Sequence, residues 1–194
     1  LCRHYRILGE QAPGGYAQFV AVPEANLLPR PKGMSAVQAA ALPLTMLTAW
    51  QMLVLRAAVR PGETVVVLAA GSGVGVAAVQ IAKLFGAHVI ATSTSDAKLA
   101  AARSLGADAT INTAREDLVD AVKAMTGKRG ADVIIEHVGK ALWDKCILAC
   151  ARGGRIVTCG ATTGYEVQTD LRHVFFRQIS ILGSTMGPKG ALFD

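Results

Sequence analysis

Short apolar runs recur along most of the chain, and several of them do not alternate with polar residues. The run at 65–68 is entirely apolar, which is typical of a strand buried on both faces of a parallel sheet. Between such runs lie segments with helical spacing, some of which end at a glycine such as Gly86 or Gly106. The pattern predicts strands at 64–69, 88–92, 109–112, 132–136, 155–159 and 178–183, and helices at 73–86, 95–105, 115–126 and 140–151.

Strict alternation of strands and helices with short loops favours one fold class. Right-handed crossovers then give parallel strands with helices on both faces, which is a doubly wound α/β domain. We therefore expect a Rossmann-like sheet, in which ligands lie beyond the carboxyl ends of the strands, at the switch point in strand order.

The first part of the chain has a different pattern. Residues 16–22 alternate and stop at Pro23, which predicts strand-and-turn structure over residues 1 to about 32. Ser35 is a suitable N-cap for a helical stretch that Pro43 divides, giving helices near 35–41 and 43–58. We place a domain boundary between 1–34 and 35–194. Because the chain opens without a methionine and closes after a strand-like run, we expect a piece of a longer protein.

The segment 70–75, Ala-Gly-Ser-Gly-Val-Gly, joins the first predicted strand to its helix. Backbone N–H groups face a ligand at a helix start, and the helix dipole favours negative charge, so such a turn can hold phosphate groups. Side chains at Gly73 or Gly75 would keep a pyrophosphate away from those N–H groups. Tight turns also need glycine without a ligand, and Ala70 and Ser72 replace the first two glycines of the G-x-G-x-x-G fingerprint, so the turn alone does not decide.

Small or polar residues follow the other predicted strands as well. Glycine comes after the first, fourth and fifth strands, which would let a ligand approach the backbone at three places. These positions are Gly71 to Gly75, Thr92 to Thr94, Asn112, His137 to Gly139, and Gly160 with Ala161. Their coincidence at one edge of the sheet predicts a dinucleotide site.

The end of the second predicted strand discriminates between the two nicotinamide dinucleotides. An acidic residue there usually binds the ribose 2′-hydroxyl of NAD(H). This chain has hydroxyl residues at 92–94 and Lys98 one turn into the next helix, and these groups attract a 2′-phosphate. The pattern favours NADP(H) over NAD(H). A plainer interpretation stays open, because Asp96 is close by and a solvated surface position also explains Lys98.

Composition narrows the function classes. The 194 residues are 52% hydrophobic and 18% charged, which supplies a core and argues against disorder. No apolar run reaches the ~18 residues of a membrane span, and no signal-peptide pattern opens the chain, so we expect a cytoplasmic protein without membrane association. The four cysteines lack the spacing of a disulfide framework. The net charge of +6 is scattered, which makes nucleic acid a poor candidate partner.

Taken together, these segments resemble the medium-chain dehydrogenase/reductase family of zinc-type alcohol dehydrogenases and quinone oxidoreductases. The resemblance covers essentially all of the chain and rests on the glycine turn and on the segments 15–19, 41–45, 48–50, 105–108, 130–133, 153–157 and 181–185. It implies a two-domain enzyme. Residues 1–34 would be the C-terminal part of a GroES-like, β-rich catalytic domain, and residues 35–194 a Rossmann dinucleotide-binding domain truncated at its C-terminal end.

The resemblance also implies which residues contact the cofactor. They are Thr48, Ser72, Gly73, Val74, Gly75, Ser93, Thr94, Lys98, Val138, Gly139, Gly160 and Ala161. It further implies a homodimer through the edge strand at 178–185. The apolar composition of that strand agrees with this, since an exposed apolar edge associates unless it is paired.

Two positions bear on metal binding. Zinc-dependent members of the family carry a cysteine ligand where this chain has Leu44, and an aliphatic side chain cannot coordinate Zn²⁺. A standard catalytic zinc is therefore not expected, which favours quinone oxidoreductase-like chemistry. Cys2 resembles the last of four cysteines in the family's structural zinc lobe. We take it as a candidate structural zinc ligand of the full-length protein, whose three partners would precede residue 1.

Other chemistry-bearing residues receive plainer interpretations. Cys146 and Cys150 lie one helical turn apart, a spacing that can bind metal. Without a third ligand nearby we expect both to be buried small hydrophobic residues. His137 follows the fourth strand, where we expect a polar group of the cleft rather than a general acid.

The function predicted from these patterns is hydride transfer between a nicotinamide cofactor and a small alcohol, carbonyl, quinone or enone substrate. No catalytic side chain is assigned. Two alternatives stay open, namely a methyltransferase that binds S-adenosylmethionine, and a redox sensor or structural protein that binds NADPH without turnover. The first would normally need an acid where Ser93 stands, and only turnover separates the second from an enzyme.

Overall fold

The computed structural model describes residues 6–187, which belong to two units. The described part of the first unit, residues 6–40, contains a 3-10 helix η1 (Glu24–Asn26) and the short helix α1 (Ala36–Ala40). Ser35 Oγ accepts a hydrogen bond from the Gln38 N–H (3.2 Å), and Gln38 Oε1 accepts one from the Ser35 N–H (2.9 Å). This reciprocal capping fixes the start of α1 at the residue that the sequence indicated.

The strand predicted at 16–22 is wrong. These residues form an irregular segment in which Tyr16 and Phe19 are exposed. A strand is stable only when a neighbouring strand accepts and donates its backbone hydrogen bonds, and the described residues of this unit supply no such partner. An alternating pattern therefore indicates which side chains would share a face of a strand. It does not indicate whether a neighbouring strand is present to pair with it.

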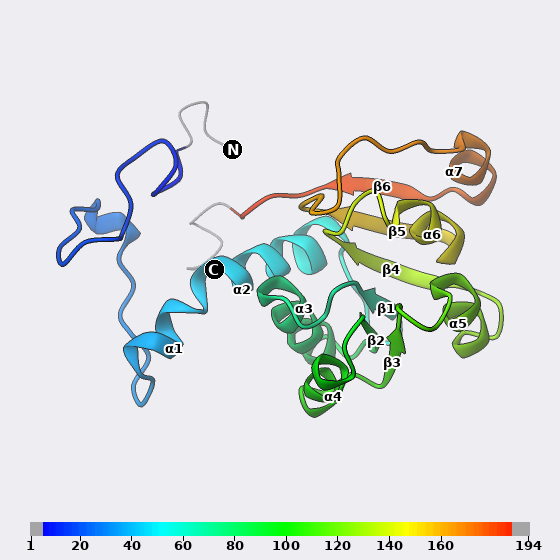
Figure 1. Cartoon of the computed structure of the whole chain (residues 1–194), viewed down its shortest axis with the longest axis horizontal. Coiled ribbons are helices and arrows are strands. Elements are labelled where there is room, and N and C mark those ends of the chain that lie inside the picture. Colours follow the sequence, from blue (N-terminus) through cyan, green and yellow to red (C-terminus); the bar gives the residue numbers. More distant parts are fainter. Residues whose placement is uncertain (1–5, 188–194) are drawn as a thin grey trace. The chain divides into compact units, whose positions relative to one another are not determined.

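The second unit, Ala41–Gly187, is built on one six-stranded sheet (Figure 1). The spatial order is β3-β2-β1-β4-β5-β6, and every neighbouring pair is parallel. The strands are β1 (Thr64–Val67), β2 (His88–Ser93), β3 (Ala109–Asn112), β4 (Ala131–Glu136), β5 (Cys150–Thr158) and β6 (Ser180–Gly183). The order reverses between β1 and β4, so the doubly wound α/β fold is confirmed.

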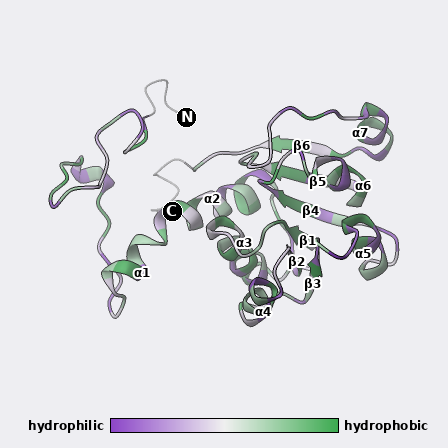
Figure 2. Cartoon of the chain, in the orientation of Figure 1, coloured by the Kyte–Doolittle hydropathy of each residue, from purple (hydrophilic) through white to green (hydrophobic). Residues whose placement is uncertain are grey.

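Helices cover both faces of this sheet. The helices are α2 (Pro43–Trp50), the π-helix η2 (Gln51–Arg56), α3 (Gly73–Leu84), α4 (Asp96–Ser104), α5 (Leu118–Met125), α6 (Trp143–Ala149) and α7 (Leu171–Arg177). Val65 and Val67 of β1 pack in the core formed with η2 and α3, whereas Val66 and Leu68 pack in the core formed with α5 and α6. Successive side chains of a strand point to opposite faces, so the unbroken apolar run fills both cores. Figure 2 shows the predominantly hydrophobic strands between these helices.

Three elements differ from the sequence pattern. Helix α7 was not predicted, because its seven residues bury none of their side chains and show no apolar stripe. The helix expected at 43–58 is α2 followed by η2. β5 begins at Cys150 instead of 155, since two glycines hid its first residues.

The helical stretch Ala36–Arg56 is long and apolar enough to span a membrane by length and composition alone. This is weak support for membrane association, because core helices of soluble proteins meet the same criterion. In this chain Ala49, Met52 and Leu53 belong to the core against β1 and α3.

Candidate functional site

A cavity of about 270 Å³ lies where the sequence predicts a ligand, at the carboxyl ends of the strands. Residues that end or follow all of the first five strands line it, namely Ala69, Gly71, Ser72, Thr92, Ser93, Thr94, Lys98, Thr113, Val138, Leu142 and Thr162. Five of the predicted cofactor-contacting residues are among them: Ser72, Ser93, Thr94, Lys98 and Val138. The switch point of the sheet and the cavity therefore coincide.

Ser72 shapes the glycine turn at one wall of the cavity. It is the N-cap of α3, and its Oγ accepts a hydrogen bond from the Gly75 N–H at 3.0 Å. The N–H groups of Gly73 and Val74, the first two of α3, bond no group in the described part of the chain. Two unpaired donors at a helix start, reinforced by the helix dipole, are suited to an anion. The Gly75 N–H, in contrast, is already occupied.

The three glycines of the turn, Gly71, Gly73 and Gly75, each exclude a side chain for a different reason. A Cβ added at Gly75 would lie 2.5 Å from the carbonyl oxygen of Ala69, and one at Gly73 would lie 2.7 Å from Cγ2 of Thr45. These two glycines permit close packing of α3 on β1 and α2, and their part in making room for a pyrophosphate stays a prediction. Gly71 lines the cavity itself, and a Cβ there would meet the Lys98 side chain at 2.6 Å.

Two residues of the cavity wall, Thr92 and Ala69, have unusual local structure. The Thr92 hydroxyl is buried and has no hydrogen-bond partner in the described part of the chain. A buried hydroxyl without a hydrogen-bond partner lowers the stability of the fold, and Thr92 is one of the residues that line the cavity. Ala69 adopts a φ of 45°, which is costly for a residue with a side chain and is common at functional sites. Both observations fit a polar ligand that bonds this wall.

Two charged residues near the end of the second strand, Lys98 and Asp96, are placed differently with respect to the cavity. Lys98 lines the cavity, whereas Asp96 bonds Asn112 Nδ2 (2.7 Å) and pairs with Arg115. Hydrogen bonds from Asn112 and Arg115 lower the pKa of Asp96. The one carboxylate that weakened the sequence argument is thus paired and does not line the cavity.

The loops after β4 and β5 pack tightly against one another beside the cavity. The Thr163 N–H donates to the Val138 carbonyl (2.8 Å), and the Lys140 N–H donates to the Gly164 carbonyl (3.0 Å). Gly139, at φ 83°, allows this approach, because a Cβ there would lie 2.5 Å from the Gly164 carbonyl oxygen. Gly139, Gly160 and Ala161 therefore shape the loops and do not line the cavity.

Buried Glu136 holds the same two loops together. Its carboxylate accepts hydrogen bonds from the N–H groups of Val138 (2.6 Å) and Gly139, and from the Thr158 hydroxyl (2.8 Å). His137 follows it, with Nε2 at 3.1 Å from Ser72 Oγ and with Nδ1 unpaired. Burial lowers the pKa of His137, although the charge of Glu136 opposes this. His137 thus faces Ser72 without lining the cavity, and its place as a polar group of the cleft stays a prediction.

Thr48 lies in α2 and its hydroxyl donates to the Leu44 carbonyl at 2.7 Å, so it is used within its own helix. Thr48, Gly73, Val74 and Gly75 do not line the cavity, and their contact with a cofactor stays a prediction. Sequence reasoning placed Gly71 and Thr92 at this edge of the sheet, and it missed Ala69, Thr113, Leu142 and Thr162 as lining residues. Their position just after a strand or at its end was the available signal.

The donor set does not form a metal centre between residues 6 and 187, where no three His, Cys, Asp or Glu side chains come together. Cys2 lies outside the described residues, so its role as a zinc ligand stays a prediction. Cys146 and Cys150 are free and buried, as expected. Burial raises the pKa of the Cys150 thiol to about 12, so it stays protonated and is a poor metal ligand.

Comparison with known proteins supports what this geometry indicates. A family profile described as zinc-binding dehydrogenase matches residues 73–192, which is more than half of the chain. The chain belongs to the zinc-binding dehydrogenase family. The resemblance to the medium-chain dehydrogenase/reductase family, and the interpretation as part of its cofactor domain, are thereby confirmed. The methyltransferase alternative has no support from this match.

Individual zinc-binding dehydrogenase relatives are similar over nearly the whole chain. A quinone oxidoreductase-like protein 2 homolog from Nematostella vectensis is 36% identical over 94% of the chain and 50% of its own length. A solved structure of an NAD-dependent alcohol dehydrogenase is 55% identical, covering 100% of this chain and 56% of that one, with a TM-score of 0.95. A solved 2-octenoyl-CoA carboxylase reductase, CinF, in complex with NADP and 2-octenoyl-CoA, is 30% identical, covering 86% and 42%, with a TM-score of 0.78.

This zinc-binding dehydrogenase chain spans about half the length of the relatives it matches. Their names include alcohol dehydrogenases, quinone oxidoreductases and reductases of CoA esters. All of these are oxidoreductases. They differ in the cofactor that their names mention, since one solved relative is called NAD-dependent and another holds NADP.

Proposed function

We propose that this chain is the cofactor-binding part of an NAD(P)H-dependent oxidoreductase. Such an enzyme transfers a hydride between nicotinamide and a small alcohol, carbonyl, quinone or enone. The observation that carries the proposal is the cavity at the switch point, lined by the helix N-cap Ser72 and lying beside the start of α3, where the N–H groups of Gly73 and Val74 are unpaired among the described residues. A cytoplasmic location is part of the same proposal.

Each wall of the cavity has a role in this proposal. The N–H groups of Gly73 and Val74 would hold the diphosphate, and Thr92 would donate to or accept from the same ligand. Val138 and Leu142 supply an apolar wall against which a ring can pack. The bound nicotinamide supplies the hydride, and these residues bind it, orient it and keep water away.

We further propose that the site prefers NADP(H) to NAD(H). In support, Lys98 and the hydroxyls of Ser93 and Thr94 line the cavity, whereas no Asp or Glu does. A 2′-phosphate forms charge-assisted hydrogen bonds with such groups, and it would be repelled by a carboxylate. The name of the 55% identical solved relative points the other way, which makes cofactor preference a direct test.

The experiment is a titration of the full-length protein with NADPH and with NADH. We expect NADPH to bind more tightly, and Lys98→Gln to weaken NADPH about tenfold, the equivalent of ~1.4 kcal/mol, with little effect on NADH. Lys32→Gln, at an exposed position of the first unit, is the matched control and should change neither. Tighter binding of NADH, or equal losses for both cofactors in Lys98→Gln, would contradict the preference.

Turnover distinguishes the enzyme from the non-catalytic alternative. The same protein is mixed with NADPH and a panel of quinones, enones, aldehydes and alcohols, and cofactor oxidation or reduction is followed by absorbance. Turnover with any member supports the enzyme. Tight binding without turnover across the panel would support a redox sensor or structural protein instead.

A further inference from the structure

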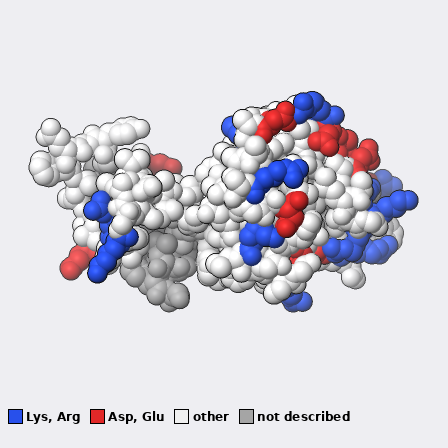
Figure 3. All heavy atoms as spheres, turned by 90° about the horizontal axis from the view of Figure 1, so that it is seen from below, with Lys and Arg blue, Asp and Glu red and all other residues white. Residues whose placement is uncertain are grey.

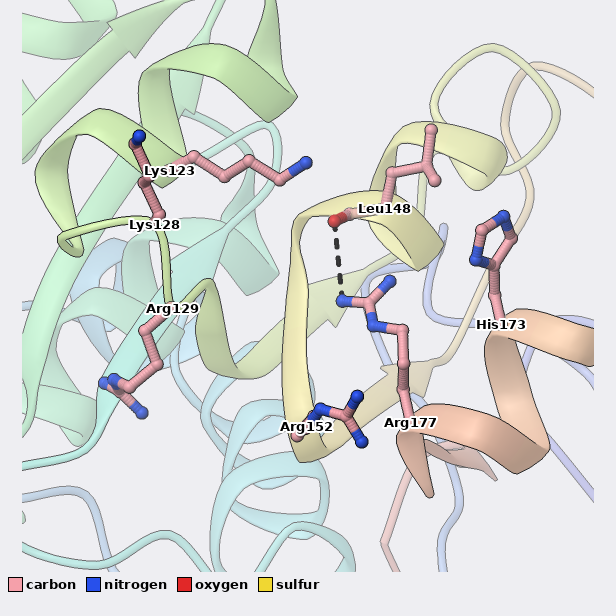
Figure 4. Close-up of a pocket in the computed structure, with 7 residues that line it drawn as sticks. All are labelled: Lys123, Lys128, Arg129, Leu148, Arg152, His173 and Arg177. Carbon is pink, nitrogen blue, oxygen red and sulfur yellow. Dashed lines mark hydrogen bonds between the residues drawn. The ribbon is translucent and has the colours of Figure 1, made fainter.

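A cavity of about 660 Å³ in the described part of the chain lies away from the cofactor site (Figure 4). It is lined by Lys123, Lys128, Arg129, Leu148, Arg152, His173 and Arg177. These residues come from the end of α5, the loop before β4, the end of α6, the start of β5, and α7. They surround the amino ends of β4 and β5, whereas the cofactor site lies at the carboxyl ends. β4 alone spans roughly 20 Å, so the two cavities are distinct.

Two arginines of this cavity are held in place by backbone carbonyls. Arg177 donates to the carbonyls of Ile147 (2.9 Å) and Cys150, and Arg152 donates to the carbonyl of Phe176 (3.1 Å). A carbonyl is neutral, so both guanidinium groups keep their full charge and several free N–H donors. They are positioned cations rather than members of ion pairs.

Two lysines add charge that the fold does not use. Lys123 and Lys128 line the cavity, and their side-chain ammonium groups make no hydrogen bond or ion pair with the described residues. In Figure 4 the Lys123 side chain extends into the space between α5 and α6. Arg129 differs, because it is paired with Asp132 and points away from the others.

The plainest explanation for these Lys and Arg residues is that cations stabilise the carboxyl ends of helices. Lys123 and Arg177 do lie in the last turns of α5 and α7, and Arg177 caps carbonyls of α6. This accounts for each cation separately, at a few tenths of a kcal/mol to about 1 kcal/mol apiece. It does not account for five Lys and Arg residues lining one cavity that no Asp or Glu lines.

One neighbouring acid neutralises one of the five cations, and the other four form no ion pair with an Asp or Glu of the described residues. Asp132 is paired with Arg129 and accepts from the Thr64 N–H, and Asp170, next to His173, is paired with Arg172. Figure 3 shows charges of both signs interspersed over the visible face of this unit. Gathered like charges repel one another and cost stability unless an anion joins them.

We propose that this cavity binds a small molecule carrying two or more phosphate groups. Lysine and arginine are the side chains that bind phosphate best, and arginines fixed by other bonds lose little entropy when a ligand arrives. The volume is within the range of small-molecule sites, and Leu148 with the aliphatic stems of the lysines offers an apolar wall. Two phosphates would engage the lysines on one side and the two fixed arginines on the other.

The experiment is calorimetric titration with inorganic pyrophosphate of the full-length protein saturated with NADPH, which occupies the diphosphate-binding helix start of the cofactor site. We expect saturable binding to the wild type that weakens at least tenfold in the double variant Lys123→Gln/Lys128→Gln. Arg30→Gln/Lys32→Gln removes the same charge from exposed positions of the first unit and should leave binding unchanged. Lys98→Gln, at the cofactor cavity, should also leave it unchanged.

Protection from acetylation provides a second measurement that does not need a variant. Pyrophosphate should slow the acetylation of Lys123 and Lys128 in the wild type, but not that of Lys32. The proposal is overturned if pyrophosphate binding is absent or is lost equally in the control double variant. It is also overturned if binding disappears in Lys98→Gln instead, or if only a short RNA binds and pyrophosphate does not compete with it.

Discussion

Single atoms decide which residues the glycine turn can carry. At Gly75 an added methyl group would meet two backbone groups, those of Ala69 and Ala70, which cannot move without shifting β1 or α3. At Gly73 the obstacle is one methyl group of the Thr45 side chain, which can rotate away. Gly73 and Gly75 belong to the same turn, but a side chain is excluded more strictly at Gly75 than at Gly73.

We therefore expect Gly75→Ala to lower the free energy of unfolding by about 1–3 kcal/mol, the usual cost of overpacking. Gly73→Ala is the matched control and should be nearly neutral, because alanine favours a helix by up to ~1 kcal/mol over glycine and offsets the smaller clash. Urea unfolding of both variants measures the difference. Equal losses would show that backbone contact is not what makes Gly75 necessary.

Burial of His137 makes the stability of the protein depend on pH. Its pKa in the folded state lies below the value of 6.5 that the unfolded chain has. Below pH 6.5 the unfolded state therefore binds a proton that the folded state does not, so the free energy of unfolding falls as the pH is lowered through this window. The slope is up to ~1.4 kcal/mol per pH unit for one such group.

In His137→Gln this contribution disappears, while the amide can still face Ser72 Oγ. We expect wild type and variant to show a constant difference in stability above pH 6.5, and the wild type to lose stability more steeply between pH 6.5 and 5.5. Urea unfolding at several pH values measures both curves. Parallel curves through that window would mean that the pKa of His137 is not lowered by folding.

At the scale of elements, the sequence predicted what buried periodicity controls. The six strands of the sheet and the helices α2 to α6 were predicted, because most of them have an apolar face that the core requires. β5 begins at Cys150 instead of 155, and β6 buries none of its residues fully, although Leu182 packs against the core. Helix α7 has no buried residue and was not predicted from the sequence. Its N-cap Asp170, which accepts a hydrogen bond from the Arg172 N–H, was the one local signal for its start. The strand at 16–22 was wrong because pairing depends on residues elsewhere.

The site was predictable to a similar degree and for a related reason. Positions just after each strand follow from topology, so Ser72, Ser93, Lys98 and Val138 could be placed at one edge. The roles of Gly75, Gly139 and Thr48 could not, because they depend on which backbone group or side chain lies within a few ångströms. Contacts of that kind are set by the packing of whole elements, which no local pattern records.

At the scale of the whole sheet unit, the two ends of the sheet are built differently. At the amino ends, charged side chains form ion pairs: Arg155 pairs with Glu63 (2.7 Å), and Lys83 pairs with Asp108 (2.8 Å). At the carboxyl ends, the Thr92 hydroxyl and His137 Nδ1 are buried without a partner. The paired groups at the amino ends hold the strands in register, and the buried unpaired groups at the carboxyl ends lie at or next to the cofactor cavity.

The remaining feature of this unit is the free edge of β6, through which we propose that two copies associate. β6 pairs with β5 alone, and Ile181 is 40% exposed on it, an arrangement that favours pairing with a second strand. We expect a dimer by sedimentation equilibrium at micromolar concentration, and a monomer for Ile181→Lys, since a charge on the edge opposes pairing. Leu84→Lys places the same change at an exposed position of α3 and should leave the dimer intact. A monomeric wild type, or a dimer that persists in Ile181→Lys, would mean that this edge is not the interface.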